Sequence, residues 1–76
     1  MPEINEVIGI VFSSDGNSLN DDDTPETIPN WDSITHIIVL SSLEEEFGIT
    51  FSDEEMTNIN TIGEIRRTVA EKIEQR

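Results

Sequence analysis

Ser33 is the side chain in this sequence best placed for covalent chemistry. It lies in the run Trp31-Asp32-Ser33-Ile34, where a polar loop meets a strongly patterned helical segment. Asp32 is a good helix N-cap, so the helix is expected to begin at Ser33 itself. A hydroxyl at that position lies beside free backbone N–H groups and the positive end of the helix dipole, which together favour an anion. The position therefore suits a covalent attachment point, such as a phosphodiester, better than a catalytic centre.

His36 is the one histidine of the chain and raises the alternative of nucleophilic catalysis. It follows Ser33 at a spacing of three residues, at which helical side chains can interact. A hydrolase built on this pair also needs a third orienting group, an oxyanion hole and a cleft, and the sequence shows none of them. We therefore expect His36 to be a packing or surface residue, with contact to a phosphate on Ser33 as a secondary hypothesis.

The acidic run Asp21-Asp22-Asp23 raises the question of a calcium site. An EF-hand loop that starts at Asp21 needs an oxygen ligand at its fifth position, glycine at its sixth and glutamate at its twelfth. The sequence has Pro25, Glu26 and Asp32 at those positions, so the motif fails. We expect no metal site here, with loose cation binding on a solvated acidic loop as the alternative.

Charge narrows the class of partner. The 76 residues include 4 basic and 17 acidic side chains, for a formal net charge of −13, and all the lysines and arginines follow residue 65. Nucleic-acid binding and docking on an anionic membrane need clustered cations, so both are disfavoured. Basic proteins are the expected partners, and acidity that serves only solubility is the alternative.

Length and composition fit one small domain spanning residues 1–76. Such a chain is too short to enclose both a deep substrate cleft and a catalytic apparatus. It contains no cysteine, so apolar packing rather than disulfides must stabilise it. The acidic N-terminus is neither a secretory signal nor a membrane span, and we expect a monomeric, cytoplasmic protein.

Helical periodicity begins at the N-terminus. The first helix is expected from about Pro2 to about Ser13, with one apolar stripe at helical spacing. A long polar loop follows over residues 14–30, and loops of this length in small domains are usually functional or disordered. Three apolar side chains are expected to pin this loop to the helices: Leu19, Ile28 and Trp31.

The second helix, expected from Ser33 to Phe47 with Gly48 after its end, is the most strongly patterned element. Its core stripe is predicted to comprise Ile37, Leu40, Leu43 and Phe47. The opposite face is predicted to carry Ile34, Ile38, Ser41 and Glu45. Two isoleucines among the acids Asp32, Glu44 and Glu45 form an apolar patch with an acidic rim, which is typical of a docking face for a basic partner. A helix buried on two sides is the alternative.

Two further helices complete the pattern. Ser52 and Glu55 form a capping box that predicts a short third helix from Asp53 to the segment 58–60. Thr61 and Glu64 repeat the motif before a fourth helix that runs to the C-terminus, with an apolar stripe of Ile62, Ile65, Val69 and Ile73. No segment alternates as strands do. The sequence therefore predicts an all-α fold, a small four-helix bundle with three longer helices and one short one.

These motifs, in this order, resemble the acyl carrier protein family. The resemblance rests on Asp32-Ser33-Ile34 opening a helix that closes with Leu43-Glu44-Glu45-Glu46-Phe47-Gly48-Ile49. It spans the whole chain and continues through the segments 51–55 and 60–65. It implies that Ser33 carries 4′-phosphopantetheine, added from coenzyme A by a separate Mg²⁺-dependent phosphopantetheinyl transferase. The thiol of that arm would hold acyl groups as thioesters, so the chain would be a carrier and not an enzyme.

The resemblance also implies which residues meet partners and cargo. Asp32, Glu44 and Glu45 would face basic patches on the transferase and on acyl-loading, condensing or acyl-transfer enzymes. Ile34 would be an apolar anchor for those partners, with Ile38 beside it. A sheltered acyl chain would be lined by residues that otherwise serve as ordinary core: Leu40, Leu43, Phe47, Ile59, Ile62 and Ile65.

The sequence departs from the common family pattern at two places. Asn30-Trp31 stands where a glycine-containing lead is common, and apolar Ile38 stands where an acid is frequent. The run Trp31-Asp32-Ser33 resembles discrete, specialised carriers more than the primary fatty acid carrier, which favours a specialised lipid, polyketide or acyl-transfer pathway. An aminoacyl or peptidyl carrier and an unmodified acidic adaptor are the alternatives.

Overall fold

Four helices form the described part of the fold, as predicted. A computed structural model describes residues 3–13 and 18–75. Its helices are α1 (Ile4–Phe12), α2 (Ser33–Phe47), α3 (Asp53–Asn58) and α4 (Ile62–Gln75). No strand is present within these residues, which confirms the all-α fold class. Within the same residues, no helix has the length and apolar character needed to cross a membrane.

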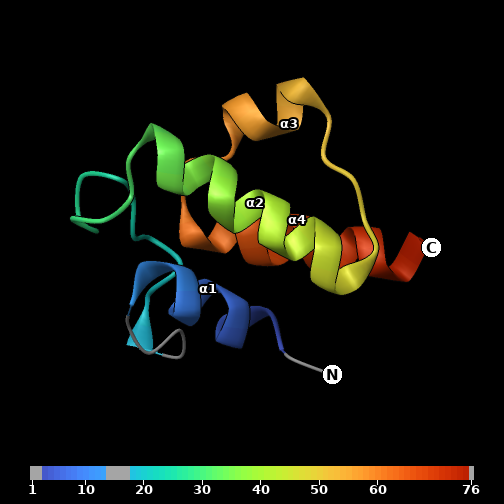
Figure 1. Cartoon of the computed structure of the whole chain (residues 1–76), viewed down its shortest axis with the longest axis horizontal. Helices are drawn as coiled ribbons and strands as arrows, with labels where there is room; N and C mark the ends of the chain where they lie inside the picture. The colour runs from blue at the N-terminus through green and yellow to red at the C-terminus, as the bar shows by residue number, and fades with distance from the viewer. Residues whose placement is uncertain (1–2, 14–17, 76) are drawn as a thin grey trace.

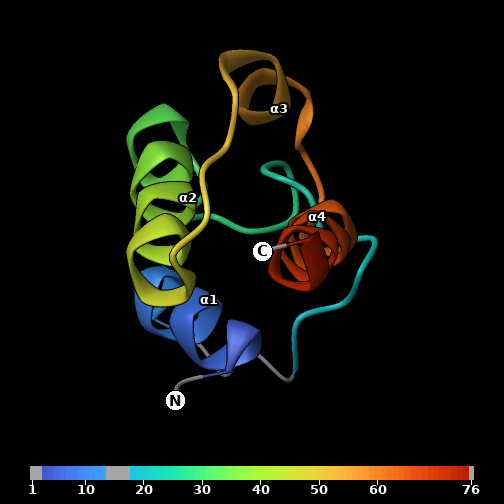
Figure 2. The same ribbon diagram turned by 90° about the vertical axis from the view of Figure 1, so that its right-hand side faces the viewer.

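The core lies among α1, α2 and α4, which pack against one another in pairs. Figures 1 and 2 show α1 on one side of this group and the short α3 on the opposite side. The most deeply buried side chains come from the three longer helices: Ile8, Val39, Leu40, Leu43, Ile62, Ile65 and Val69. The prediction that three apolar side chains pin the long loop to the helices is confirmed, because Ile28 and Trp31 are buried and Leu19 packs on the core.

The first helix ends close to its predicted end. It ends at Phe12 because Ser13 adopts the left-handed conformation with φ of 54°, and the Ser13 N–H donates to carbonyls of the last turn. The predicted start at Pro2 falls outside the described residues. Glu3 precedes the helix in an extended conformation, so the described helix begins at Ile4.

The long loop is fastened to the start of α4. The N–H groups of Ile62 and Gly63 donate to the carbonyls of Asp23 and Asp21, each at 3.0 Å. A helix N-terminus leaves such N–H groups without helical partners, so the loop backbone caps α4. A Cβ added at Gly63 would lie 2.9 Å from the Asp21 Cβ, so a larger residue here would force the loop to shift.

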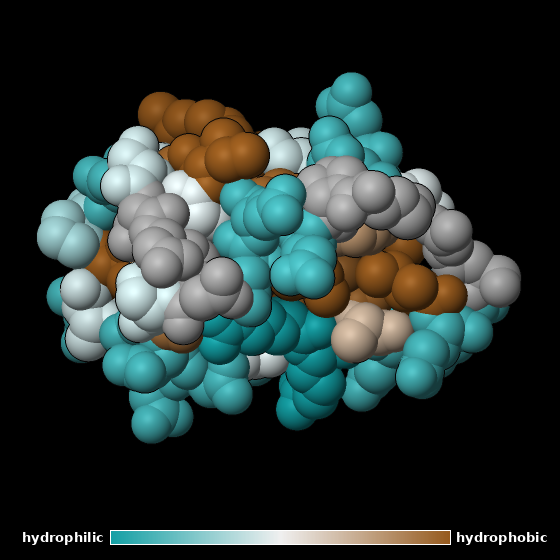
Figure 3. Space-filling model, turned by 90° about the horizontal axis from the view of Figure 1, so that it is seen from below, coloured by the Kyte–Doolittle hydropathy of each residue, from teal (hydrophilic) through white to brown (hydrophobic). Residues whose placement is uncertain are grey.

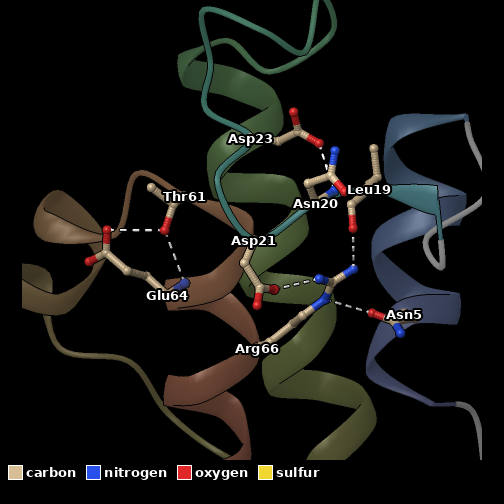
Figure 4. Close-up of polar contacts among 8 residues, drawn as sticks. All are labelled: Asn5, Leu19, Asn20, Asp21, Asp23, Thr61, Glu64 and Arg66. Atoms are coloured by element: carbon tan, nitrogen blue, oxygen red, sulfur yellow. Dashed lines mark hydrogen bonds and ion pairs between the residues drawn. The ribbon is translucent and has the colours of Figure 1, made fainter.

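Arg66 on α4 ties the same loop to α1 (Figure 4). Its guanidinium donates to the Asp21 carboxylate at 2.6 Å, to the Leu19 carbonyl at 2.9 Å and to the Asn5 side-chain oxygen at 2.9 Å. The planar fork of arginine is suited to several simultaneous acceptors. The acid at the head of the Asp21-Asp22-Asp23 run therefore serves as a structural anchor. Among the described residues, no three acidic or histidine side chains cluster in a way that could hold a metal ion.

The third helix is held mainly by polar contacts. The Ser52 and Glu55 capping box forms as predicted, with both reciprocal hydrogen bonds present, and none of the residues of α3 is fully buried. The Glu55 carboxylate also pairs with Lys72 of α4 at 2.9 Å, and the Lys72 ammonium lies 5.7 Å from the centre of the Phe51 ring. The N–H of Ser52 and then Lys72 lower the pKa of Glu55 below its ordinary value.

Candidate functional site

The predicted attachment residue lies at the start of α2. Asp32 is the N-cap, and its carboxylate accepts from the Thr35 N–H at 2.9 Å. This hydrogen bond is the main cause that lowers the pKa of Asp32 below its ordinary value of 3.8. Ser33 is the first helical residue and is exposed, so the predicted helix start and cap are both confirmed.

His36 connects the loop before α2 to α3. The Trp31 indole N–H donates to His36 Nδ1 at 3.0 Å, and His36 Nε2 lies 2.6 Å from the Met56 carbonyl oxygen. Both ring nitrogens are therefore occupied, and neither is available as a base for the Ser33 hydroxyl. The structure supports the predicted packing role of His36. Sequence reasoning missed both partners because they come from different elements.

A surface groove of about 670 Å³ opens beside Ser33. Its walls come from the loop before α2, the first two turns of α2, and α3 with the residue that follows it. The lining residues are Pro25, Trp31, Asp32, Ser33, His36, Ile37, Asp53, Met56, Thr57 and Ile59. Trp31, Ile37, Met56 and Ile59 make the lining largely apolar. The exposed hydroxyl of Ser33 therefore stands at the edge of a groove that could hold an elongated, partly apolar group.

The exposed face of α2 is more apolar than predicted. Ile34 is 70% exposed and Ile38 is 47% exposed, as expected for the outward face, but Ile37 is also 57% exposed. The prediction that Ile37 belongs to the core is wrong, and Val39 is buried in its place. On a helical wheel, the buried side chains of α2 cover one arc that comprises Val39, Leu40, Leu43 and Phe47. At 100° per residue, Ile37 lies roughly 100° from the centre of that arc, so it does not face the core.

Two acids of the predicted partner set differ in their surroundings. Glu45 is exposed on α2, whereas Glu44 is half-buried and its carboxylate accepts from the Phe51 N–H at 2.8 Å. Glu44 therefore fastens the segment before α3 to the end of α2. Asp32 combines an exposed position with its capping role.

The six predicted acyl-pocket residues are all buried in one continuous core: Leu40, Leu43, Phe47, Ile59, Ile62 and Ile65. Four of them, Leu40, Leu43, Ile62 and Ile65, are completely inaccessible to solvent. Ile59 differs because it also lines the groove beside Ser33. The core therefore approaches the groove through Ile59.

A family model and a solved structure both match this chain. A family model described as "phosphopantetheine attachment site" matches residues 31–69, from Trp31 through α2 and α3 into α4. The solution NMR structure of a holo acyl carrier protein from Geobacter metallireducens superposes with a TM-score of 0.83. The two sequences are 26% identical, and the match covers 99% of this chain and 90% of that one.

Proposed function

This chain belongs to the acyl carrier protein family, and we propose that Ser33 is the residue to which its 4′-phosphopantetheine cofactor is attached. The exposed Ser33 hydroxyl at the start of α2 is the observation that carries the proposal. The family match includes this residue. When bound, the group supplies a thiol that carries acyl groups as thioesters on a flexible arm.

The residues around Ser33 fit that group. Ser33 begins a helix of 15 residues, whose first N–H groups and dipole favour the negative charge of a phosphodiester. The groove beside the hydroxyl offers apolar walls from Trp31, Ile37 and Met56 to the organic part of the arm. Asp32 holds the first turn in place through Thr35, so the hydroxyl has a fixed starting position.

The outward face of α2 supports a role in docking. Ile34, Ile37 and Ile38 expose apolar surface directly after Ser33, and Glu45 lies farther along the same helix. A net charge of −13 favours basic partners. We infer that the transferase and acyl-handling enzymes bind this face transiently, with an attraction that weakens as salt rises.

The proposed cargo is an acyl group loaded by separate enzymes of a specialised pathway. Hydrogen bonds occupy both ring nitrogens of His36, so this imidazole is not a free base for the Ser33 hydroxyl, which supports a carrier role over a hydrolase built on the Ser33–His36 pair. Catalysis then belongs to the partner enzymes. The chain positions its arm, and each partner enzyme binds the chain in turn.

Thiol titration tests the proposal directly because the chain contains no cysteine. The purified protein is incubated with coenzyme A, Mg²⁺ and a broad-specificity phosphopantetheinyl transferase, and the protein fraction is then reacted with a thiol reagent. We expect one thiol per chain, no thiol in Ser33→Ala, and one thiol in Ser41→Ala, which removes an exposed serine elsewhere on α2. A thiol-free wild-type protein would favour the unmodified adaptor.

A further inference from the structure

A second, smaller groove lies between α1 and α2, away from Ser33. It has a volume of about 170 Å³ and is lined by Val7, Ile10, Val11, Ser42 and Glu46. Ile10 is the most exposed of the large apolar side chains in the described residues, at 77%. Seen from the α1 side, hydrophobic side chains reach the surface among hydrophilic ones (Figure 3). The groove is several times larger than the ~30 Å³ of one water molecule, so it has room for about one side chain.

The groove is continuous with the proposed docking face of α2. Residues four apart form one row along a helix surface, and such a row runs through Ile34, Ile38, Ser42 and Glu46. The row begins beside Ser33 and ends at the groove. A protein that covers Ile34 and Ile38 therefore reaches the α1–α2 groove by continuing along the same row.

The chemistry of the groove selects its occupant. Val7, Ile10 and Val11 offer an apolar wall, and Glu46 places an exposed carboxylate at one edge. The ion pairs formed within residues 3–13 and 18–75 use Asp21 and Glu55 and leave Glu46 without a cation. Arginine and lysine combine an apolar stem with a charged head, so they match a surface of this kind.

From these observations we propose that the α1–α2 groove receives an arginine or lysine side chain of a basic partner protein. The stem of that side chain lies along Ile10 and Val11, and its cation meets Glu46. This inference rests on the proposed carrier function, because it extends the docking face that serves Ser33. It makes α1 part of the partner interface, and the groove at the end of that interface selects a cationic side chain of the partner.

An NMR titration of the unmodified, ¹⁵N-labelled protein tests the groove. The probes are N-acetyl-arginine amide and its uncharged analogue N-acetyl-citrulline amide, compared at constant ionic strength. We expect saturable shifts at the amides of Val7, Ile10, Val11, Ser42 and Glu46 with the arginine probe, and clearly weaker binding of the citrulline probe. Equal binding of the two probes, or shifts spread evenly over all acidic helices, would overturn the proposal.

Matched variants locate the charge. Glu46→Gln should weaken binding of the arginine probe about two- to fivefold, the range expected for an exposed ion pair, whereas Glu71→Gln on α4 should leave it unchanged. An unchanged affinity in Glu46→Gln contradicts the proposal. Shifts at the groove amides on dilution without probe would also contradict it, because they identify a second copy as occupant. The thiol titration tests attachment at Ser33 independently of the groove. A failure of the groove proposal can therefore be distinguished from a failure of the proposed carrier function.

Discussion

The Trp31 indole N–H donates to His36 Nδ1 at 3.0 Å, and the two rings lie nearly parallel, with an interplanar angle of 21°. Because Nδ1 accepts this hydrogen bond and a carbonyl oxygen can only accept, Nε2 is the ring nitrogen that donates to the Met56 carbonyl. One histidine thus connects the loop before α2 to α3. The connection builds the part of the groove that faces Ser33.

Trp31→Phe tests that connection because it removes the indole N–H and keeps an aromatic ring. The variant leaves His36 Nδ1 without its donor, so the free energy of unfolding should fall by about 1–3 kcal/mol. Amide hydrogen exchange should quicken in α3, whose residues contribute little buried surface of their own. Urea unfolding and hydrogen exchange measure the two effects. Unchanged exchange in α3 would show that the bridge does not hold this helix.

Asp32 gives a pH dependence with a defined sign. Its pKa in the folded protein is lowered below the ordinary value of 3.8, so the ionised form stabilises the fold. That stabilisation is complete above pH 3.8 and is lost as the pH falls through the lower folded value. In Asp32→Asn this pH-dependent part should be absent. Unfolding free energies of both proteins between pH 6 and pH 3 should therefore converge or cross toward acid, and parallel curves would contradict the prediction.

Gly63→Ala tests the docking of the long loop on α4. The added Cβ would lie 2.9 Å from the Asp21 Cβ and 3.1 Å from its backbone carbonyl oxygen, so the loop must shift. We expect a loss of about 1–3 kcal/mol in unfolding free energy, as for other overpacked sites. Ala70→Ser, at an exposed position of the same helix, is the control and should change it by less than about 0.5 kcal/mol. Equal stability of the two variants would show that the loop yields without cost.

The docking face predicts a separation of stability from partner turnover. Ile34→Glu and Glu45→Lys alter exposed positions, so helical circular dichroism and the unfolding midpoint should stay close to the wild type. Their kcat/KM as substrates of the phosphopantetheinyl transferase should fall about fivefold or more, mainly through KM, because each removes an interface contact worth about 1 kcal/mol. If both variants unfold, these residues belong to the core and the docking face is wrong.

Local signals made the start of α2 predictable from sequence. The helix caps depend only on neighbours within one helical turn. This holds for Asp32 before Ser33 at the start of α2, for Gly48 at its end, and for Ser52 with Glu55 at α3. The exposure of Ile37 was not predictable in the same way. Residues 37–40 are all apolar, so periodicity alone cannot choose which of them face the core.

Contacts between distant segments also could not be predicted from the sequence. Arg66 reaches Asn5 and Leu19 across 61 and 47 residues, and His36 reaches Met56 across 20. These bonds depend on how the helices pack, which short-range patterns do not encode. The half-buried position of Glu44 has the same origin, since its partner Phe51 lies beyond the turn at Gly48.

Peptide-level mass spectrometry tests the central claim most directly. The chain is coexpressed with a broad-specificity phosphopantetheinyl transferase, its intact mass is measured, and the modified residue is located after digestion. Attachment at Ser33 predicts one phosphopantetheine increment on the peptide that contains Ser33, lost in Ser33→Ala and kept in Ser41→Ala. An unchanged intact mass, or an increment on any other residue, would contradict it.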